Sequence, residues 1–366
     1  MPKFQFYLPT NLTRIQAQAV DSSEPIFLSG VPGTGKTVVS IKRLQNAASK
    51  RKKGIIFTYG KLLRKTIEEK LENNSHMPVS NIHKWIWDAQ SKGNKQKLEY
   101  FLSDANLSNA IASIKTSGKK YDEILVDEGQ DLSINSYKLL KELTPNLNIS
   151  ADDAQQINNK KEATNEEEIL KLFPNLKNIT LDEIFRSAHE LYKFAIQFVP
   201  ENAKAHDETL LERLKRKQEK SGGAADKPFV YLEADIQGMY QTIKDIIDEN
   251  PQDNIGVLVE LVDEVDQFAD ELSKEYEISK YHNQDVVPST LNNIIVTTFK
   301  SAKGVEFDYV IIPFLEKWDS YVHNPHEYYV GVTRAKNQVH ILSMCGTPKI
   351  MNNFDTDTYQ LVDNRG

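Results

Sequence analysis

Short apolar runs alternate with helical patterns in both halves of the chain. In the first half, the apolar runs lie at 25–29, 54–58, 123–126 and 147–151. In the second half, they lie at 229–233, 255–260, 293–298, 309–314 and 338–343. Apolar runs of this length, separated by helical segments, are typical of parallel β-sheets covered by helices. The pattern predicts an α/β protein with two domains, at 1–180 and 181–366.

Two polar stretches interrupt this alternation. The first, at about 87–120, is rich in Lys, Ser and Asn, and we expect it to form a small helical insertion in the first domain. Its lysines could contact phosphates, although a solvated surface is the commoner reason for such a composition. The second, at 203–227, contains LERLKRKQEKSGGAADK, which predicts a charged helix followed by a flexible turn.

The composition is that of a soluble globular protein. Of the 366 residues, 39% are hydrophobic and 27% are charged. The formal net charge is -7, so no global basic field attracts the chain to nucleic acid. Any binding of nucleic acid must therefore come from a local groove.

The cysteine content and the N-terminal sequence indicate the cellular compartment in which the protein is expected. The chain has one cysteine, Cys345, which excludes an intrachain disulfide framework and a cysteine-rich zinc site. The opening MPKFQFYLPTNL lacks the apolar core of a signal peptide, and no apolar run is long enough to span a bilayer. We expect a cytoplasmic protein that does not bind a membrane.

A phosphate-binding loop follows the first apolar run. Gly30, Gly33, Gly35, Lys36 and Thr37 match the spacing G-x-x-x-x-G-K-[ST] between a predicted strand and a predicted helix. The glycines let backbone N–H groups converge on phosphates at a helix N-terminus. Lys36 is expected to reach the β- and γ-phosphates, and the Thr37 hydroxyl to ligate Mg²⁺. The other residues assigned to this nucleotide site are Val31, Pro32, Thr34 and Val38.

The run EILVDEGQD, at 123–131, supplies two carboxylates at the end of a predicted strand. Asp127 is expected to hold Mg²⁺ through water, and Glu128 to activate the attacking water. An acidic pair after a strand is weak evidence alone, because acidic residues often cap strand ends. Together with the phosphate loop, it predicts hydrolysis of a nucleoside triphosphate, ATP, with Mg²⁺.

The string DEGQD, at 127–131, resembles the corresponding motif of superfamily 1 helicases of the UvrD/Rep/PcrA type. Further motifs of that family follow in order, so the resemblance extends from about 12 to 343. It implies an α/β fold of two RecA-like parallel-sheet P-loop domains with a nucleotide cleft between them.

The resemblance assigns nucleotide contacts to several further residues. In LTRIQAQAV, Gln16 would read the adenine edge, although an amphipathic helix with a surface glutamine gives the same pattern. In SADDAQQI, Gln155 would couple the γ-phosphate to the interdomain cleft. In LDEIFRS, Arg186 would contact the γ-phosphate from the second domain.

The last two motifs also resemble those of the family. In VTTFKSAKGVEFDYVII, Glu306 is placed to bond the ribose. In YYVGVTRAK, Arg334 corresponds to the arginine finger, and Tyr329 would pack near the base or the cleft. Positive charge delivered from a second domain would stabilise the phosphoryl-transfer transition state.

A single-stranded nucleic acid path is implied by residues from both halves. The candidate residues in IIFTYGKLL and SNIHKW would stack on bases or contact phosphates. Roles in the core or as helix caps fit these residues equally well. Those of the motif around 298–304 would lie near the nucleic acid. The six residues so assigned are Phe57, Thr58, Ser80, His83, Thr298 and Lys303.

The chain departs from the family in its accessory elements. Only about 87–119 can stand for the first of the two large family insertions, and the second has no room. The segment after SADDAQQ is INNKKEAT, which lacks the aromatic residue that stacks on a base in the family. Hydrolysis is not affected by these changes, whereas strand separation is put in doubt.

Two functions remain open. The first is an ATP-dependent motor that steps along single-stranded DNA, 3′ to 5′ by the family's polarity, with RNA as an alternative track. The second is a regulatory ATPase that controls a protein partner, such as a nuclease in a DNA repair or anti-phage defence complex. A metabolic kinase is a third reading, but no motif for an acceptor substrate is visible.

Overall fold

The computed structural model describes residues 2–72, 74, 76–89, 104–155, 163–183, 189–199, 211–212, 214–215, 227–282, 287–320, 325–344 and 346–366. The chain forms two compact units. The N-terminal unit is Phe6–Glu183, and the C-terminal unit is Ile184–Gly366 together with Met1–Gln5. Among the described residues, no helix is both long and apolar enough to cross a membrane.

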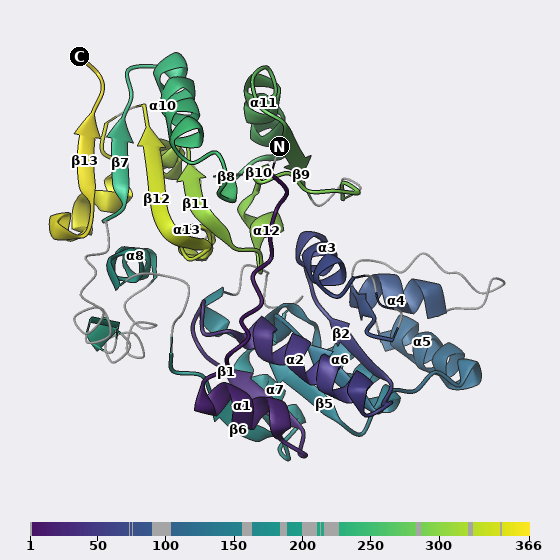
Figure 1. The fold of residues 1–366 in the computed structure, drawn as a ribbon. Helices are drawn as coiled ribbons and strands as arrows, with labels where there is room; N and C mark the ends of the chain where they lie inside the picture. Colours follow the sequence, from purple (N-terminus) through teal and green to yellow (C-terminus); the bar gives the residue numbers. More distant parts are fainter. Residues whose placement is uncertain are drawn as a thin grey trace. The chain divides into compact units, whose positions relative to one another are not determined.

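The N-terminal unit is built on a six-stranded sheet with the order β3-β2-β4-β5-β1-β6, in which every pair of neighbours is parallel (Figure 1). Its strands are β1 (Ile26–Ser29), β2 (Gly54–Phe57), β3 (Val79–Ser80), β4 (Glu123–Val126), β5 (Leu147–Ser150) and β6 (Lys177–Thr180). Its helices are α1 (Arg14–Asp21), α2 (Lys36–Ser49), α3 (Lys61–Lys70), α4 (Ile82–Ala89), α5 (Asp104–Ser117), α6 (Ile134–Leu143) and α7 (Glu166–Leu172), with short 3-10 helices η1 (Gly129–Asp131) and η2 (Asp153–Gln155). Since β5 lies between β1 and β4, the loops that follow these three strands meet at one edge of the sheet.

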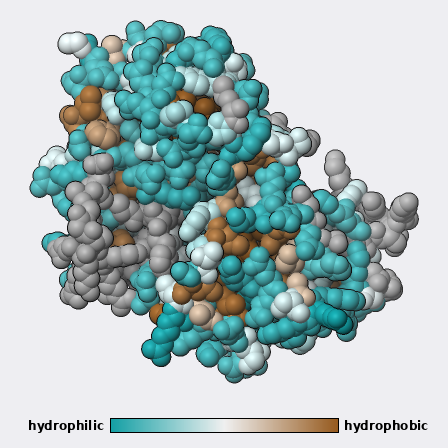
Figure 2. Space-filling view, in the orientation of Figure 1, coloured by the Kyte–Doolittle hydropathy of each residue, from teal (hydrophilic) through white to brown (hydrophobic). Residues whose placement is uncertain are grey.

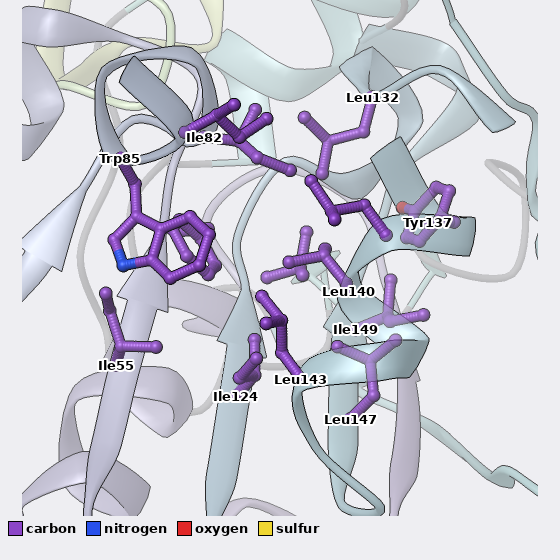
Figure 3. Close-up of a cluster of buried hydrophobic side chains, with 14 of the residues drawn as sticks. Ile55, Ile82, Trp85, Ile124, Leu132, Tyr137, Leu140, Leu143, Leu147 and Ile149 are labelled. Atoms are coloured by element: carbon purple, nitrogen blue, oxygen red, sulfur yellow. The ribbon is translucent and has the colours of Figure 1, made fainter. Parts of the chain in front are cut away.

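One face of this sheet is covered by an apolar cluster. Ile55, Ile124 and Ile149 project from three adjacent strands and pack with α4 and α6 (Figure 3). Trp85 of α4 joins the cluster and donates its indole N–H to the Tyr121 hydroxyl at 2.8 Å. Central strands of a parallel sheet are buried on both faces, which explains their continuous apolar sequence.

The small helical insertion is only partly described. Of the stretch at about 87–120, α5 is helical and contributes to the apolar cluster, whereas 90–103 lie outside the described residues. The second polar stretch, 203–227, also lies mostly outside them.

A buried ion pair lies at the amino-terminal end of the same sheet. Arg43 of α2 contacts Glu123 of β4 through Nε at 2.8 Å and Nη2 at 2.6 Å, and both side chains are less than a tenth exposed. The same Glu123 oxygen accepts from Asn148 Nδ2 at 3.0 Å, and Asn148 Oδ1 accepts from the Ile26 backbone N–H at 3.0 Å. This network ties α2 to three adjacent strands.

Arg43→Met should destabilise the protein by about 3–5 kcal/mol, because it leaves the Glu123 carboxylate buried without its cation. Urea unfolding measures this change, with Arg14→Met as the control, since Arg14 is exposed on α1. A second change, Glu123→Leu, should recover part of the loss because it removes the stranded charge. Equal stability of Arg43→Met and the wild type would contradict this role.

The C-terminal unit has a seven-stranded sheet with the order β13-β7-β12-β11-β8-β10-β9, again parallel throughout (Figure 1). Its strands are β7 (Phe229–Leu232), β8 (Ile255–Val259), β9 (Ile278–Tyr281), β10 (Ile294–Thr298), β11 (Phe307–Ile312), β12 (Ala335–Ser343) and β13 (Gln360–Asp363). Its helices are α8 (His189–Ala195), α10 (Ile236–Glu249), α11 (Val262–Leu272), α12 (Phe299–Ala302) and α13 (Pro325–Val332), with 3-10 helices η3 (Ile196–Phe198), η5 (Leu315–Ser320), η6 (Lys349–Asn353) and η7 (Thr356–Thr358). The predicted α/β class, with a RecA-like parallel sheet in each unit, is confirmed.

The first five residues cluster with the C-terminal unit, although the sequence pattern grouped them with 1–180. The Phe4 ring meets the Phe307 ring edge-on at 5.8 Å. Gln5 and Asn254 exchange two hydrogen bonds, from Gln5 N at 3.1 Å and from Asn254 Nδ2 at 3.0 Å. These contacts hold the first five residues on the C-terminal unit, because they bury an aromatic ring and satisfy backbone polar groups.

The surface drawn in Figure 2 is mainly hydrophilic, with small separate hydrophobic areas. The large hydrophobic side chains that are exposed among the described residues are Tyr7, Trp87, Ile134, Leu261 and Leu361. Such scattered exposure is normal for a globular protein and does not by itself indicate an interface.

Candidate active site

The loop between β1 and α2 requires glycine at its two ends. Gly30 has φ 148°, and a Cβ there would lie 2.8 Å from the Leu181 carbonyl oxygen. Gly35 has φ 88° and precedes the first residue of α2. Between them, Thr34 Oγ1 donates to the Val31 carbonyl at 2.9 Å. This backbone turns the loop around the N-terminus of α2, where anions bind well.

Gln16 is buried against this loop and is not a surface glutamine. Its Oε1 accepts from the Thr13 backbone N–H at 3.0 Å, which forms a capping box at the start of α1. Its Nε2 donates to the Thr34 carbonyl at 2.9 Å. Both polar atoms of the side chain are thus used to join α1 to the phosphate loop. Recognition of adenine by Gln16 stays a prediction.

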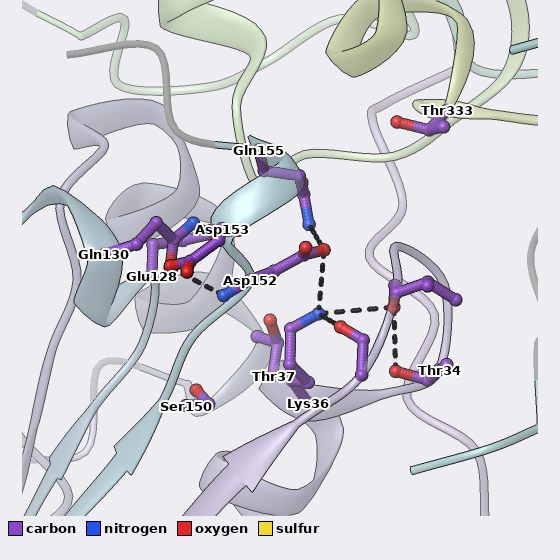
Figure 4. Close-up of polar contacts among 12 residues, drawn as sticks. Thr34, Lys36, Thr37, Glu128, Gln130, Ser150, Asp152, Asp153, Gln155 and Thr333 are labelled. Carbon is purple, nitrogen blue, oxygen red and sulfur yellow. Dashed lines mark hydrogen bonds and ion pairs between the residues drawn. The ribbon is translucent and has the colours of Figure 1, made fainter. Parts of the chain in front are cut away.

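Lys36 lies at the centre of the site (Figure 4). Its Nζ donates to the Gly30 carbonyl and, at 3.2 Å, to the Val31 carbonyl. It also pairs with Asp152 Oδ2 at 3.4 Å, and both side chains are buried. Asp152 comes within reach because it follows β5, which is the neighbour of β1 in the sheet. The ammonium group is therefore oriented at the position where the loop would hold phosphates.

Thr37 and Asp127 form a second contact at the same edge. Thr37 Oγ1 donates to Asp127 Oδ2 at 2.7 Å, and Ser150 Oγ donates to Asp127 Oδ1 at 2.8 Å. Burial and the adjacent Glu128 carboxylate raise the pKa of Asp127, while the hydrogen bonds from Thr37 and Ser150 oppose that rise.

A hydroxyl and one carboxylate fit the way in which Mg²⁺ is held beside a nucleotide. This ion uses one or two protein carboxylates, and phosphates and water complete its coordination. In the part of the chain that the structure describes, no group of three or more His, Cys, Asp or Glu side chains could hold a metal alone. Thr37 and Asp127 thus suit a metal that arrives with its triphosphate.

Glu128 directly follows Asp127, the candidate Mg²⁺ ligand. It adopts a left-handed backbone, with φ 58° and ψ 47°. Its carboxylate is buried and accepts a hydrogen bond from Gln130 Nε2 at 2.7 Å through Oε2. Gln130 in turn accepts from the Asp152 backbone N–H at 3.1 Å. Gln130 therefore links Glu128, the candidate base, to Asp152, which pairs with Lys36.

Gln155 lies in η2, beside the Lys36 pair. Its Nε2 donates to Asp152 Oδ2 at 2.5 Å, and the side chain is buried (Figure 4). Asp152 therefore receives two hydrogen bonds on the same oxygen, from Lys36 and from Gln155. The structure brings together Lys36, Thr37, Asp127, Glu128 and Gln155 around one edge of the sheet.

Sequence reasoning assigned no role to Asp152, Gln130 or Ser150, which complete this cluster. The available signal was their position at the ends of predicted strands, since DEGQD follows β4 and SADD begins on the last residue of β5. The carboxyl ends of adjacent parallel strands lie at the same edge. The polar residues at the carboxyl ends of β4 and β5 could therefore have been predicted, as a group, to lie in the active site.

A second carboxylate pair lies near Asp152. Glu166 Oε1 accepts from the Asp153 backbone N–H at 3.3 Å, and the Glu166 N–H donates to Asp153 Oδ1 at 2.9 Å. Burial, together with the Asp153 and Asp152 carboxylates, raises the pKa of Glu166 to about 7. Near neutral pH the cluster carries less negative charge than its number of carboxylates suggests, which favours the approach of a triphosphate.

Phe57 was predicted to line a nucleic acid path, and in this structure its ring is enclosed, so its contact with nucleic acid stays a prediction. Its side chain is 1% exposed, lies in the apolar cluster of the N-terminal unit and meets Trp85 edge-on at 5.7 Å. The ring has no exposed face on which a base could stack. The physical reason is that Phe57 is the last residue of β2 and faces α4, so it fills the core.

The other three nucleic acid candidates of this unit lie around the carboxyl ends of β2 and β3. Thr58 N donates to the Ser80 carbonyl at 3.0 Å, and among the described residues the buried Thr58 hydroxyl has no hydrogen-bond partner. Ser80 Oγ donates to the Asn81 carbonyl at 3.1 Å, and Asn81 Oδ1 accepts from the His83 N–H at 2.9 Å. Burial lowers the pKa of His83. Their contact with nucleic acid stays a prediction.

In the C-terminal unit, Thr298 and Lys303 flank α12 and both are buried. Thr298 Oγ1 caps this helix by accepting from the Ser301 N–H at 3.2 Å. Gly304, with φ 80°, follows Lys303, and Glu306 is half-buried just before β11. The capping role of Thr298 explains its presence without nucleic acid, so its predicted contact is not required by the fold.

Tyr329 lies within α13 and Arg334 follows shortly after its last residue, and both are buried. Arg334 Nε donates to the Val330 carbonyl at 3.0 Å, and Nη2 donates to Thr333 Oγ1 at 3.3 Å. Arg186, the other candidate contact with the γ-phosphate, lies outside the described residues. In this structure the Arg334 guanidinium is thus bonded to residues at the C-terminal end of α13 and just beyond it.

The loop, the Asp127–Glu128 pair and the parallel sheet that presents them define the class of P-loop nucleoside triphosphatases. Residues 14–160 match the family of the AAA domain, and residues 241–343 match the core domain of viral superfamily 1 RNA helicases. The two matches cover separate halves of the chain, and each is shorter than half of it. They support a protein of the superfamily 1 helicase kind. Neither distinguishes the UvrD/Rep/PcrA type.

No protein of curated function matches the chain. Among solved structures, the chain is similar to the C-terminal domain of a possible DNA helicase from Lactobacillus plantarum WCFS1, with 15% identity. That match covers 48% of this chain and 98% of the other, with a TM-score of 0.38. A TM-score this low does not indicate a common fold.

Proposed function

We propose that this protein hydrolyses ATP with Mg²⁺ and uses the energy to move along single-stranded DNA. The observation that carries the proposal is the grouping of Lys36, the Thr37–Asp127 contact and Glu128 at the carboxyl edge of one parallel sheet. These are the functional groups that bind a triphosphate, hold its metal and activate water.

Each residue has a defined part in the proposed reaction. The loop N–H groups and the Lys36 ammonium would bind the β- and γ-phosphates, and Glu128 would accept a proton from the attacking water. The bond from this water oxygen to the γ-phosphorus forms as the bond to the bridging oxygen breaks, which yields ADP and inorganic phosphate. Mg²⁺ held at Thr37 and Asp127 supplies charge neutralisation of the phosphate oxygens.

Arg334, Arg186 and Gln155 would act at the γ-phosphate. An arginine that reaches the transferred phosphoryl group stabilises the charge of the transition state. Arg334 is buried and held by Val330 and Thr333 in this structure, so its use in catalysis requires those hydrogen bonds to be exchanged. Gln16, Glu306 and Tyr329 are proposed to contact the base and ribose.

A nucleic acid partner is supported by the match of 241–343 to a helicase core domain and by the unsatisfied Thr58 hydroxyl beside Ser80. DNA as the track and 3′ to 5′ movement rest on the family resemblance alone. RNA uses the same contacts to the phosphate backbone and is the competing track.

Single-stranded DNA should raise the ATPase rate by about tenfold or more, which requires only about 1.4 kcal/mol of added transition-state stabilisation. A steady-state phosphate-release assay with and without an oligonucleotide measures this. The stimulation should weaken as salt rises, because backbone binding releases counterions. An RNA of equal length distinguishes the two tracks. A wild-type rate that neither nucleic acid changes would rule out the motor.

A regulatory ATPase that controls a protein partner, such as a nuclease of a repair or defence complex, is the second candidate. It is favoured by the enclosed Phe57 ring and by the short link between β9 and β10, where only 282–293 intervene. An assay with a tailed DNA duplex separates the two candidates. ATP-dependent unwinding favours the motor, whereas ATPase activity that depends on a co-purifying protein favours the regulator.

A further inference from the structure

Gln130 lies between the two halves of the candidate active site. It is fully buried, at 0% exposure, and neither the phosphate loop nor the Asp–Glu pair includes it. Its Nε2 donates to Glu128 Oε2 at 2.7 Å, and its Oε1 accepts from the Asp152 N–H at 3.1 Å. Only one orientation of the amide satisfies both contacts, because the carboxylate needs a donor and the backbone N–H needs an acceptor.

The backbone that carries Gln130 is held by contacts that do not involve the Glu128 side chain. Tyr137 Oη donates to the Gly129 carbonyl at 2.6 Å, and the Thr164 N–H donates to the Gln130 carbonyl at 3.2 Å. A Cβ at Gly129 would lie 2.6 Å from Tyr137 Oη, so the turn is tightly packed. The amide is thus presented from a hydrogen-bonded, closely packed turn.

Glu128 needs such a support. It adopts a left-handed backbone, and its carboxylate and that of Asp127 repel one another. A charge-assisted hydrogen bond from a buried donor restrains the direction in which the Glu128 carboxylate points.

The opposite end of Gln130 reaches the side of the site that holds phosphate. Gln130 Oε1 accepts a hydrogen bond from the Asp152 N–H. The Asp152 carboxylate in turn contacts Lys36 and Gln155. The chain of contacts therefore runs from the base through Gln130 to the residues assigned to the γ-phosphate.

We propose that Gln130 is a positioning residue that aligns the Glu128 carboxylate with the phosphate-binding side of the site through its amide N–H. The proposal rests on ATP hydrolysis as the function of this site. Misplacement of a catalytic group by about 1 Å can cost about 10²-fold in rate. The contacts proposed for the nucleotide do not include this amide, so kcat should change and nucleotide affinity should not.

Two variants separate the two ends of the amide. Gln130→Met has a similar shape but no polar atom, so both contacts are lost. Gln130→Glu keeps an acceptor for the Asp152 N–H but offers no amide donor to Glu128 and adds a negative charge beside it. In both variants kcat should fall by about 10²-fold, while the Kd for ATP, measured by fluorescence of a nucleotide analogue, should stay within about threefold.

A double-mutant cycle tests whether Gln130 acts through Glu128. In a Glu128→Gln background the base is already absent, so Gln130→Met should cause no further loss of kcat. A purely structural role would reduce kcat by the same factor in both backgrounds. Thermal unfolding of each variant is measured in parallel, and Gln130→Glu carries the test if Gln130→Met does not fold.

Three results would overturn the proposal. Wild-type kcat in Gln130→Glu would show that the donor to Glu128 is not needed, and equal losses in both backgrounds would show a structural role. A rise in the Kd for ATP that accounts for the whole loss would place Gln130 in nucleotide binding. These outcomes differ from a failure of the proposed function, in which the wild-type chain itself hydrolyses no ATP.

Discussion

ATP hydrolysis should fall by about 10³-fold when Lys36 is replaced by alanine. Removal of one preorganised donor from a transition state typically costs about 10²–10³-fold, and Lys36 also binds the ground state, so the affinity for ATP should fall as well. Phosphate release and nucleotide binding, measured on the same preparation, separate the two effects.

The structure provides a control for this variant. Lys50 ends the same helix and is exposed, so Lys50→Ala should hydrolyse ATP at the wild-type rate. Lys36→Ala also removes the cation from the buried Asp152 carboxylate, and a thermal melt distinguishes unfolding from loss of chemistry. A folded Lys36→Ala protein that retains wild-type hydrolysis would contradict the assignment of the phosphate loop.

Glu128→Gln should reduce kcat by about 10²–10⁴-fold with little change in ATP binding, because general base catalysis contributes about that factor. The amide cannot accept the proton of the attacking water, whereas the loop and Lys36 are unchanged. Single-turnover hydrolysis with excess enzyme reports the chemical step alone.

Glu72 offers a matched control for this substitution. It also has a left-handed backbone, with φ 55°, but it is exposed and far along the chain from the site. Glu72→Gln should therefore retain the wild-type rate. Loss of ATP binding in Glu128→Gln, in place of loss of turnover, would assign Glu128 to the metal or the phosphates and not to water.

The central strands could be predicted because burial on both faces leaves a continuous apolar sequence. The strands at 54–58, 123–126 and 255–260 appear in the structure to within a residue at each end. The four missed strands, β3, β6, β9 and β13, all lie at the edges of their sheets. β6 reads KNIT, lies at the edge of its sheet and is largely exposed, and β13 reads QLVD in the same situation. Edge strands do not need apolar side chains, so their sequences carry little signal.

The same limit applies to the site. Motif spacing placed Lys36 and Thr37 on one loop and Asp127 on another, but it could not show that β5 lies between these loops and supplies Asp152 and Ser150. That adjacency depends on strand order, which the periodicity of the chain does not contain.

Phe57 illustrates a different limit. An aromatic residue at a strand end fits a stacking platform and a core equally well in sequence. The decision comes from Trp85, which α4 brings from a distant part of the chain to close over the ring. A residue whose exposure depends on such a partner cannot be assigned from its own neighbourhood.

The placement of the first five residues has a consequence for dividing this protein into parts. The chain passes between the units twice, at 5–6 and again at 183–184, so a cut at 183–184 leaves the first five residues of the C-terminal unit bonded to the N-terminal unit. A fragment that starts at residue 184 would lack Phe4, which packs against Phe307, and the Gln5 backbone, which exchanges two hydrogen bonds with the Asn254 side chain. The C-terminal unit is therefore complete only when both ends of the chain are supplied, as in a circular permutant that joins them.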